Sequence, residues 1–541
     1  MSNRRFEFVQ GSSAKFWEIS QRGVNVVTTY GRIGGKGAST TKTEASPVAA
    51  KALAAKLIAE KTKKGYVEAK AAPPKPTQTA STKSKAPKAL AKTTVLATSP
   101  DYKFVEKILT FGDAYVQQIG DVVEIYDTKF KGTVVAVKGT VITVRNAKGK
   151  EAQSDSAIDY ISVDSSPTIT AAWDSFLRND KPDGVAYSDK FVPPALHASL
   201  QKNFAKLAKA EPVDYHPGSG TKVRDLVHPS LYPYVSGKSK FVGAAPTNAG
   251  KPPKYDRWGR KYEGSDYQWL PSQFYVGDNG DVDIRSYINN LPAGYQALQN
   301  DLAKLFTCAL PLLESVLGYV QMMKFYVEDD ADVADESELP EGGKPKPAKI
   351  PPRKLRNREL QVVPKIVEYQ LQPNESHEGV WHVEGMSHEH IIATCVYVLD
   401  RDDALQGGDI EFKRACTVEE AGMMFWGADQ LRPAPAQELM EAAQIPLGHV
   451  ATPKGRLFVF PNSHIHKLSK LFSDSDQATR RRVIVFWVVD PNVTIVSTRD
   501  IAPQQTSMKH AEALRIRLKL MEERKLHKGK FNVRSISLCE H

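Results

Sequence analysis

The chain contains one stretch that cannot contribute to a folded core. Residues 71–99 are rich in proline, alanine, lysine and threonine and contain no acidic residue. Such a composition buries too little apolar surface to offset the entropy lost on ordering, so it predicts an extended, disordered basic linker. The 541 residues must therefore fold as separate parts on either side of it. A chain of this length has room for about two to four domains.

The positive charge of the chain is concentrated in its first 100 residues. They hold 18 Lys/Arg and 5 Asp/Glu, a net charge of +13, whereas the other 441 residues hold 55 and 57, a net charge of −2. A basic N-terminal region joined to a nearly neutral remainder predicts an anionic partner, and nucleic acid is the first candidate. The alternative is a lysine-rich segment that only keeps the chain in solution.

Cysteine and apolar patterns bear on the compartment. The four cysteines lie far apart, which argues against a disulfide scaffold or a zinc ribbon and predicts a reducing compartment: Cys308, Cys395, Cys416 and Cys539. We expect neither a secretory signal at the start nor an apolar run long enough to span a bilayer, and hence no membrane partner. The expected location is the nucleus, or otherwise the cytoplasm.

Residues 1–70 predict a small domain made of a β-meander and a helix. β-Prone runs broken by glycines fill residues 4–35, and a helix should run from Pro47 to about Lys64. The motifs Lys15-Phe-Trp17, Tyr30-Gly-Arg-Ile-Gly34 and Glu60–Tyr66 resemble the WGR domain, a nucleic-acid-binding module known from poly(ADP-ribose) polymerases. Tyr30 replaces the tryptophan that names that domain.

Four residues of this module are candidates for contact with nucleic acid. Arg32 and Lys36 offer donors to a phosphate, and Trp17 and Tyr30 present rings that could stack on a base or sugar. The alternative is that both aromatic residues build the core of a tiny domain. For Trp17 this alternative carries at least equal weight, because neighbouring positions on its strand are apolar.

Two further regions precede the chemistry-bearing part. Residues 100–165 contain short β-prone runs punctuated by glycine, which fits a small SH3-like barrel, and the Gly-Asp-x-Val opening resembles KOW or Tudor-type modules that bind nucleic acid or peptides. A structural spacer is the alternative. Residues 166–354 predict helical support with a buried helix at Leu302–Leu317, and their acidic-then-basic stretch 328–354 predicts a mobile surface insert.

Residues 355–505 predict a β sandwich or barrel, because many short strands follow one another without long helices between them. A longer insert with helix-like stretches occupies residues 415–450. The chain as a whole is therefore expected to be a multidomain α+β protein. Six segments are the expected strands: 360–370, 380–385, 390–399, 408–412, 456–460 and 482–490.

The motif His382-x-Glu384 is the strongest chemical signal in this region. Side chains two apart on a strand point the same way, so an imidazole and a carboxylate would share one face. A second imidazole from a later strand would complete two His and one carboxylate on one side of a metal, the arrangement of non-heme Fe(II) oxygenases. An arginine about one strand further on could clamp a dicarboxylate cosubstrate.

Four elements follow in order: His382-x-Glu384, Gly407-Gly408-x-x-x-Phe412, Gly455–Pro461 leading to His466, and Arg480–Trp487. The ordered set resembles the double-stranded β-helix, or jelly roll, of Fe(II)/2-oxoglutarate dioxygenases, prolyl-hydroxylase-like members included. Seven motifs resemble a large, mostly fungal family described only as a domain of unknown function, over roughly residues 170–505: His228–Pro233, Ser286–Leu291, Trp381–Met386, Glu389–Ile391, Phe460–Asn462, Asp490–Asn492 and Pro503–Gln505.

The resemblance implies a set of site residues. His382, Glu384 and His466 would hold Fe(II), with Glu in place of the commoner Asp. Arg481, six residues before Trp487, would bind 2-oxoglutarate, and dioxygen would complete the site. Arg482 replaces Arg481 if the strand register slips by one, and it would line the cosubstrate site together with Trp487. Three histidines crowd the same segments as alternative ligands: His388, His390 and His464.

Three functions remain open from these observations. The first is an Fe(II)/2-oxoglutarate-dependent dioxygenase, for hydroxylation or oxidative demethylation, directed to DNA, RNA or chromatin by residues 1–165. The second is an oxygenase that acts on a protein side chain or a small metabolite. The third is an inactive oxygenase fold that serves as a nucleic-acid-binding scaffold.

The last part of the chain, residues 506–541, predicts a basic amphipathic helix and a tail. Leu514, Leu518 and Met521 would lie on one face of the helix. We expect this face to pack on the barrel, with a partner protein as the alternative.

Overall fold

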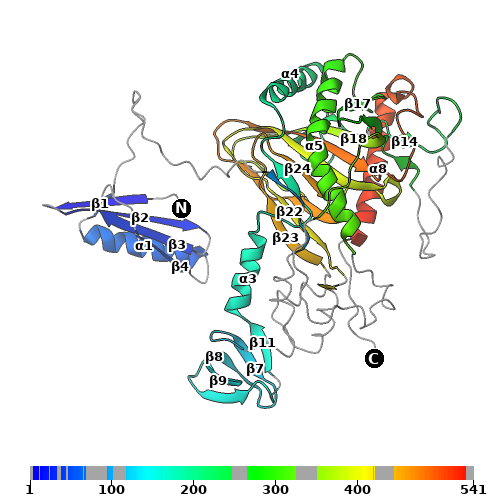
Figure 1. Cartoon of the computed structure of the whole chain (residues 1–541). Coiled ribbons are helices and arrows are strands. Elements are labelled where there is room, and N and C mark those ends of the chain that lie inside the picture. Colours follow the sequence, from blue (N-terminus) through cyan, green and yellow to red (C-terminus); the bar gives the residue numbers. More distant parts are fainter. Residues whose placement is uncertain are drawn as a thin grey trace. The chain divides into compact units, whose positions relative to one another are not determined.

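The computed structural model describes most of the chain in segments (Figure 1): residues 4–10, 13–22, 25–32, 38–43, 47–64, 66–68, 94–100, 117–159, 161–245, 265–324, 350–417, 419–420 and 444–531. The chain divides into two compact units, Met1–Lys88 and Ala89–His541. The predicted insert at residues 328–354 and the predicted helical stretches of residues 415–450 lie mostly outside the described segments.

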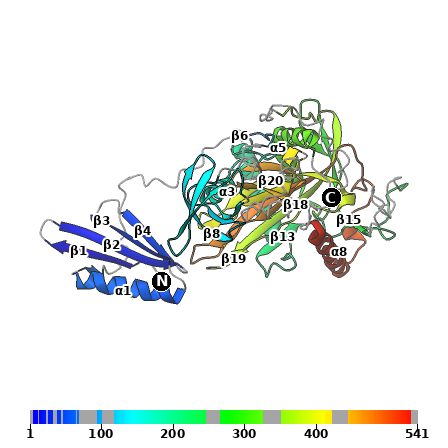
Figure 2. The same cartoon turned by 90° about the horizontal axis from the view of Figure 1, so that it is seen from below.

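The first unit is a five-stranded antiparallel sheet with one helix. Helix α1 (Pro47–Lys63) lies along one face of the sheet (Figure 2), and Phe6, Trp17 and Ala54 pack between them. Proline starts the helix because its missing N–H costs nothing in the first turn. The strand order is β4-β3-β2-β1-β5, with β1 Arg4–Gln10, β2 Ser13–Arg22, β3 Asn25–Arg32, β4 Ala38–Thr43 and β5 Val67–Glu68.

The second unit opens with a smaller five-stranded antiparallel sheet. Val123, Val134 and Ile142 are fully buried in its core, and helix α3 (Pro167–Leu177) follows its last strand. Its identification as an SH3-like or KOW-like barrel stays a prediction. The order is β10-β9-β8-β7-β11, with β7 Val122–Ile125, β8 Phe130–Lys138, β9 Val141–Arg145, β10 Glu151–Asp155 and β11 Ile161–Ser165.

The main body of the second unit is built on a nine-stranded antiparallel sheet, called here the main sheet. Strand β27 lies at its middle, between β18 and β20, although it comes last in the sequence. The order is β17-β16-β18-β27-β20-β24-β12-β6, and β13 also pairs with β18. The bounds are β6 Thr94–Val95, β12 Ala186–Ser188, β13 Val223–Val227, β16 Ser272–Val276, β17 Val282–Ile284, β18 Arg358–Leu371, β20 Ile391–Arg401, β24 Leu457–Pro461 and β27 Thr479–Val489.

Strand β6 corrects the predicted linker. Thr94 and Val95 pair with Ser188 and Tyr187 at the edge of the main sheet, and the N–H of the buried Ala97 donates a hydrogen bond to Ser315 Oγ at 3.0 Å. The prediction of disorder is therefore wrong for residues 94–99. The composition of the linker hid the few apolar residues at its end, which an existing sheet edge can order.

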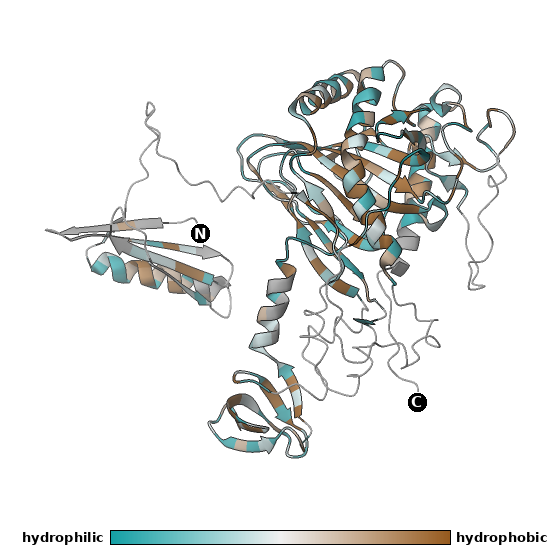
Figure 3. Cartoon of the chain, in the orientation of Figure 1, coloured by the Kyte–Doolittle hydropathy of each residue, from teal (hydrophilic) through white to brown (hydrophobic). Residues whose placement is uncertain are grey.

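Helices α4 (Pro194–Ala210) and α5 (Gln296–Met322) cover one face of the main sheet, and the largest apolar cluster lies between them and the strands (Figure 3). Helix α5 confirms the expected buried helix at residues 302–317. Contrary to expectation, α5 is long and apolar enough by length and composition to cross a membrane; 67% of its most apolar 18-residue window is buried inside the protein.

A second layer of short strands faces the other side of the main sheet. Phe412 and Leu447 from this layer pack against Phe458 and Val483 of the main sheet, so the two layers form a sandwich with its own core. The layer contains the sheets β23-β22-β25 and β19-β26-β21, with β19 Ser376–His377, β21 Leu405–Gly407, β22 Ile410–Ala415, β23 Gln444–Val450, β25 His464–Leu468 and β26 Leu471–Ser473. Separate from it is a two-stranded sheet, β14 Tyr234–Val235 with β15 Tyr267–Gln268.

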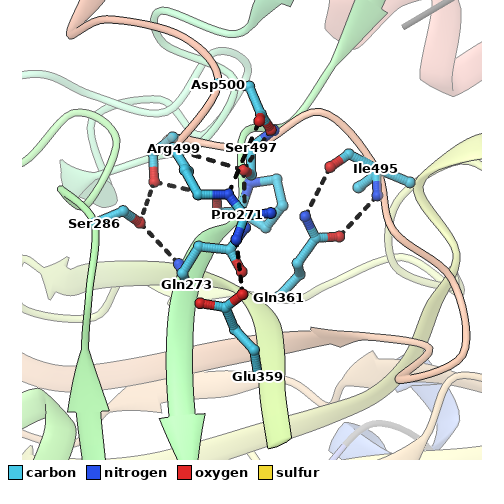
Figure 4. A network of polar contacts seen from close by, with 10 residues as sticks. Pro271, Gln273, Ser286, Glu359, Gln361, Ile495, Ser497, Arg499 and Asp500 are labelled. Carbon is cyan, nitrogen blue, oxygen red and sulfur yellow. Dashed lines mark hydrogen bonds and ion pairs between the residues drawn. The ribbon is translucent and has the colours of Figure 1, made fainter. Parts of the chain in front are cut away.

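A polar network fastens the chain after β27 to strands β16 and β18 of the main sheet (Figure 4). Gln273 Nε2 donates to Ser497 Oγ at 2.9 Å, and Arg499 forms an ion pair with Glu359 at 2.8 Å. Gln361 exchanges two hydrogen bonds with the backbone of Ile495. Beyond this network a 3-10 turn, η4 (Gln504–Thr506), leads to helix α8.

Helix α8 (His510–Phe531) packs on the main body, as expected. Leu514 and Met521 pack against apolar clusters as predicted, but Leu518 is 54% exposed. The apolar pattern alone did not show that Arg517 and Arg524 are buried as well.

Candidate metal centre

Three side chains converge on the inner side of the sandwich. His382 Nε2 and His466 Nε2 lie 3.6 Å and 3.4 Å from Glu384 Oε1, and the two imidazole rings are 4.4 Å apart. His466 comes from β25. His382 forms a single backbone bridge with His466, and Glu384 follows in a bend. The predicted strand over residues 380–385 is therefore wrong, although its two side chains still meet.

The backbone fixes this convergence. The N–H groups of His382 and His466 donate to each other's carbonyl oxygens at 3.0 Å and 2.9 Å, so the two residues face one another. Asn462 then holds the bend: its Oδ1 accepts the N–H of Glu384, and its Nδ2 donates to the carbonyl oxygen of Glu384, both at 2.9 Å. Asn462 was part of a family motif, but sequence reasoning gave it no role.

The proton positions on the two imidazoles follow from their partners. His382 Nδ1 lies 2.7 Å from the carbonyl oxygen of Val380, and His466 Nδ1 lies 3.3 Å from that of His464. A carbonyl oxygen only accepts, so each Nδ1 carries the hydrogen and each Nε2 keeps a lone pair. Two lone pairs and a carboxylate therefore face a common point. Such a donor set suits a divalent transition metal, with the rings oriented by outer hydrogen bonds.

Burial and charge favour the ligating protonation states. Burial alone would raise the pKa of Glu384, but the neighbouring His382 and His466 outweigh it and hold the pKa well below its usual range. Burial, followed by the nearby His382, lowers the pKa of His466. Glu384 is thus an anion and His466 a neutral imidazole near neutral pH, as metal ligands must be.

The alternative histidines have other partners. His464 Nε2 donates to the carbonyl oxygen of Asp183 at 2.8 Å, and burial lowers the pKa of this imidazole to about 4. His388 Nε2 contacts the carbonyl oxygen of Tyr267 at 2.9 Å. His390 has a left-handed backbone with φ of 49° and ends the short 3-10 helix η3 (Ser387–Glu389).

Arg481 lies on the inner face of the main sheet. Its side chain is 2% exposed, and its Nη1 donates to the carbonyl oxygen of Gly408 at 3.1 Å. Arg481 Nε, Trp487 Nε1 and Thr394 Oγ1 are buried without a hydrogen-bond partner among the described residues. Unpaired buried donors are rare, so the free Nε of Arg481 suits a polar ligand at this end of β27. Burial lowers the pKa of Arg481 to about 10, which leaves it a cation at neutral pH.

Arg482 points the other way. Its Nε donates to Glu368 at 2.6 Å, and its guanidinium lies 5.0 Å from the centre of the Phe204 ring on the helix-covered face. The alternation of side chains along β27 therefore brings Arg481, and not Arg482, to the face that carries Trp487.

A second His/carboxylate group, missed from the sequence, combines His216, Asp225 and His228. His216 Nδ1 lies 2.9 Å from Asp225 Oδ2, and the N–H of Ser230 donates to His228 Nδ1 at 3.1 Å. Arg517 lies 4.0 Å from the same carboxylate. His216 and Arg517 already contact the Asp225 carboxylate, and His228 Nδ1 accepts a hydrogen bond. The three residues therefore form a hydrogen-bonded cluster, and their imidazoles do not offer free lone pairs to a metal as those of the first site do. Only His228 lay in a recognised motif; a bulge in the β13–β18 pairing and a turn bring the others together.

The residues of the first unit that were predicted to contact nucleic acid differ in their exposure. Tyr30 is 47% exposed, but Trp17 is 3% exposed and packs against Phe6, which disagrees with a stacking role for Trp17. Arg32 ends β3, with its side chain outside the description, and Lys36 lies outside the described residues.

Comparison with known proteins bears on both units. Residues 2–73 match the WGR domain, and residues 171–512 match the family described as "Protein of unknown function (DUF4246)". No curated protein matches the chain.

Solved structures are similar only in part. A Bacteroides fragilis protein is 47% identical over 13% of this chain and 19% of its own, with a TM-score of 0.12. IDO from Bacillus thuringiensis is 9% identical over 56% of this chain and 89% of its own, with a TM-score of 0.26. A Pseudomonas putida prolyl-4-hydroxylase is 9% identical over 57% and 92%, with a TM-score of 0.24. These scores are too low to carry an argument.

The family match covers well over half of the sequence, and the chain belongs to the DUF4246 family, with a WGR domain in front.

Proposed function

We propose that the second unit is an Fe(II)/2-oxoglutarate-dependent dioxygenase that carries out hydroxylation or oxidative demethylation. The observation that carries the proposal is that two imidazole Nε2 atoms lie 3.4 Å and 3.6 Å from one Glu384 oxygen, on the inner side of a sandwich of antiparallel sheets. Two His and one carboxylate on one side of a metal leave positions for a cosubstrate and dioxygen.

The path of the chain supports a jelly roll. From β18 onward the chain passes from the main sheet to the His382 segment, and back to β20. It then crosses to β22 and β23, returns to β24, crosses again to β25 and ends on β27. Eight segments divided four and four between two facing sheets in this order are the pattern of a double-stranded β-helix. The helices α4 and α5 would then be its outer support.

The residues of this chain have distinct parts in the proposed reaction. When bound, Fe(II) with 2-oxoglutarate and dioxygen supplies the oxidising chemistry. His382, Glu384 and His466 would hold the metal, and the Arg481 guanidinium would pair with the distal carboxylate of the cosubstrate. Phe460, whose ring lies 4.6 Å from that of His466, keeps water away from this side of the site.

The first unit supports targeting to nucleic acid or chromatin, and with it a nuclear location. It contains the WGR domain and lies in the region of net charge +13. Such a charge gives salt-dependent affinity for phosphate backbones. An oxygenase for protein side chains or metabolites, and an inactive scaffold, are the competing functions. The first alternative would give a different product, and the inactive scaffold would give none.

Succinate release by the full chain with Fe(II) and 2-oxoglutarate tests the activity. We expect His382→Ala and Glu384→Ala to abolish it, and His388→Ala, which removes a neighbouring imidazole bonded elsewhere, to keep it. Wild-type protein that binds one Co(II) but releases no succinate would favour the scaffold. Mass spectrometry of nucleosides and peptides after reaction then separates the remaining two functions.

A further inference from the structure

Glu389, five residues after the proposed ligand Glu384, is a buried carboxylate with three donors. It is 1% exposed, and its Oε1 accepts the N–H of Trp269 at 2.6 Å and Arg524 Nη2 at 2.5 Å. Its Oε2 accepts the N–H of Met386 at 2.8 Å. A buried carboxylate needs a counter-charge, and Arg524 of helix α8 supplies it.

The Glu389 carboxylate closes the turn that carries Glu384. Met386 donates to it from two residues beyond Glu384, and the N–H of Glu389 returns a hydrogen bond to the Met386 carbonyl oxygen at 2.9 Å. Gly385, which lies between Glu384 and Met386, has φ of 67°. A Cβ atom added to Gly385 would lie 3.0 Å from Glu389 Oε2. The carboxylate therefore packs directly against the backbone that aims the Glu384 side chain.

Arg524 also supports the inner face of the main sheet. Its guanidinium lies 4.0 Å from the centre of the Trp269 ring, and Trp269 stacks on Trp487 with ring centres 4.6 Å apart. Trp487 pairs with Thr394 across β20 and shares its face with Arg481. One side chain of α8 thus contacts both the metal-ligand turn and the ring that stacks on Trp487, at the opposite end of β27 from Arg481.

Helix α8 lies mostly outside the family match, which ends at residue 512. Two arginines of α8 are buried, and their partners differ: Arg517 pairs with Asp214, whereas Arg524 contacts Glu389. The Nε and Nη1 of Arg524 have no hydrogen-bond partners among the described residues, so its contact with Glu389 is what sets this buried cation apart from Arg517.

We infer that Arg524 is a positioning residue for the metal centre, acting through Glu389 on the turn that presents Glu384; the inference rests on the proposed function. Its matched control is Arg517 on the same helix. Arg517 is equally buried and forms a two-point ion pair with Asp214 at 2.6 Å and 2.9 Å, but it makes no contact with Glu389.

The test measures Co(II) affinity and the Co(II) d–d absorption spectrum of the full chain, with its melting temperature. We expect Arg524→Gln to weaken Co(II) binding about 10- to 100-fold, as loss of an outer partner does at other metal sites, and to shift the spectrum. Arg517→Gln should lower the melting temperature and leave Co(II) affinity and spectrum unchanged. Equal Co(II) binding by wild type and Arg524→Gln would overturn the inference.

A second variant covers the case in which Arg524→Gln does not fold. Glu389→Gln removes the charge and replaces one of the two acceptor oxygens with an NH2 group, so it should shift the same spectrum. If Arg524→Gln folds, the double variant should lose less Co(II) affinity than the two single losses added together, because both break the Arg524–Glu389 contact; full additivity would contradict the inference. Wild type that binds no Co(II) would overturn the metal centre itself, an outcome distinct from a failure of Arg524 alone.

Discussion

His382 and His228 are both imidazoles beside a carboxylate, and the hydrogen bonds of their Nδ1 atoms separate their roles. His382 Nδ1 donates to a carbonyl oxygen and frees Nε2, whereas His228 Nδ1 accepts an N–H and places the hydrogen on Nε2. The sequence spacing and order indicated the first group. It could not indicate the second, which depends on a turn and a β-bulge, nor the proton positions, which depend on the backbone around each ring.

Arg481→Lys should raise the KM for 2-oxoglutarate about 10- to 100-fold, because lysine keeps the charge but lacks the planar fork that pairs with a carboxylate at two points. Co(II) affinity should stay unchanged. Arg482→Lys is the control, since its partner is Glu368 on the other face. Steady-state succinate release measures both. An unchanged KM in Arg481→Lys would contradict the role of Arg481.

His228 should make the fold sensitive to acid. Burial lowers its pKa well below the usual 6.5, although Asp225 opposes this; Lys365, His216 and Arg517 lower it further. As the pH falls, His228 is therefore protonated in the unfolded chain before it is protonated in the folded protein. The free energy of unfolding is unaffected by His228 above pH 6.5 and decreases below it, by up to about 1.4 kcal/mol per pH unit. His228→Gln should flatten urea-unfolding stability between pH 6.5 and 5 relative to wild type. If the free energy of unfolding fell equally with pH in His228→Gln and wild type, His228 would not be the source of the acid sensitivity.

At the scale of elements, helices with clear caps or apolar patterns were predicted well, and elements fixed by polar residues were not. Helix α1 begins at Pro47, and α5 contains the expected buried stretch. The bend at Glu384 was expected as a strand, because alternation of side chains cannot reveal that Asn462 captures the backbone there. In α8 the expected Leu514 and Met521 do pack on the body, but the apolar pattern could not show that Arg517 and Arg524 are buried beside them.

The turn Gly407-Gly408 links an element to the site. Gly408 has φ of 73°, and a Cβ there would lie 2.6 Å from Leu471 Cδ1 and 3.2 Å from Arg481 Nη1. Gly408→Ala should therefore displace Arg481 and raise the KM for 2-oxoglutarate.

At Gly407 the Cβ would lie 2.1 Å from the carbonyl oxygen of Lys470. Gly407→Ala should mainly destabilise the fold, by about 1–3 kcal/mol. Urea unfolding and succinate kinetics separate the two effects.

At the scale of the whole molecule, the two units should be separable. Deletion of residues 1–88 should leave succinate release intact and remove most of the salt-dependent DNA affinity, measured by fluorescence anisotropy at several salt concentrations. Deletion of residues 1–99 also removes β6 and the Ala97–Ser315 hydrogen bond, so it should lower the melting temperature further. Equal melting temperatures would show that β6 is dispensable.

The position of β27 in the main sheet has a consequence for how the protein folds. Residues 358–371 and 391–401 flank the strand Thr479–Val489 on both sides and are synthesised well before it. Until that strand inserts, both neighbours expose unpaired edges, and pairing across such long sequence separations is slow. The main sheet therefore closes late, and the nascent chain passes through an aggregation-prone stage in which chaperones would bind its open edges.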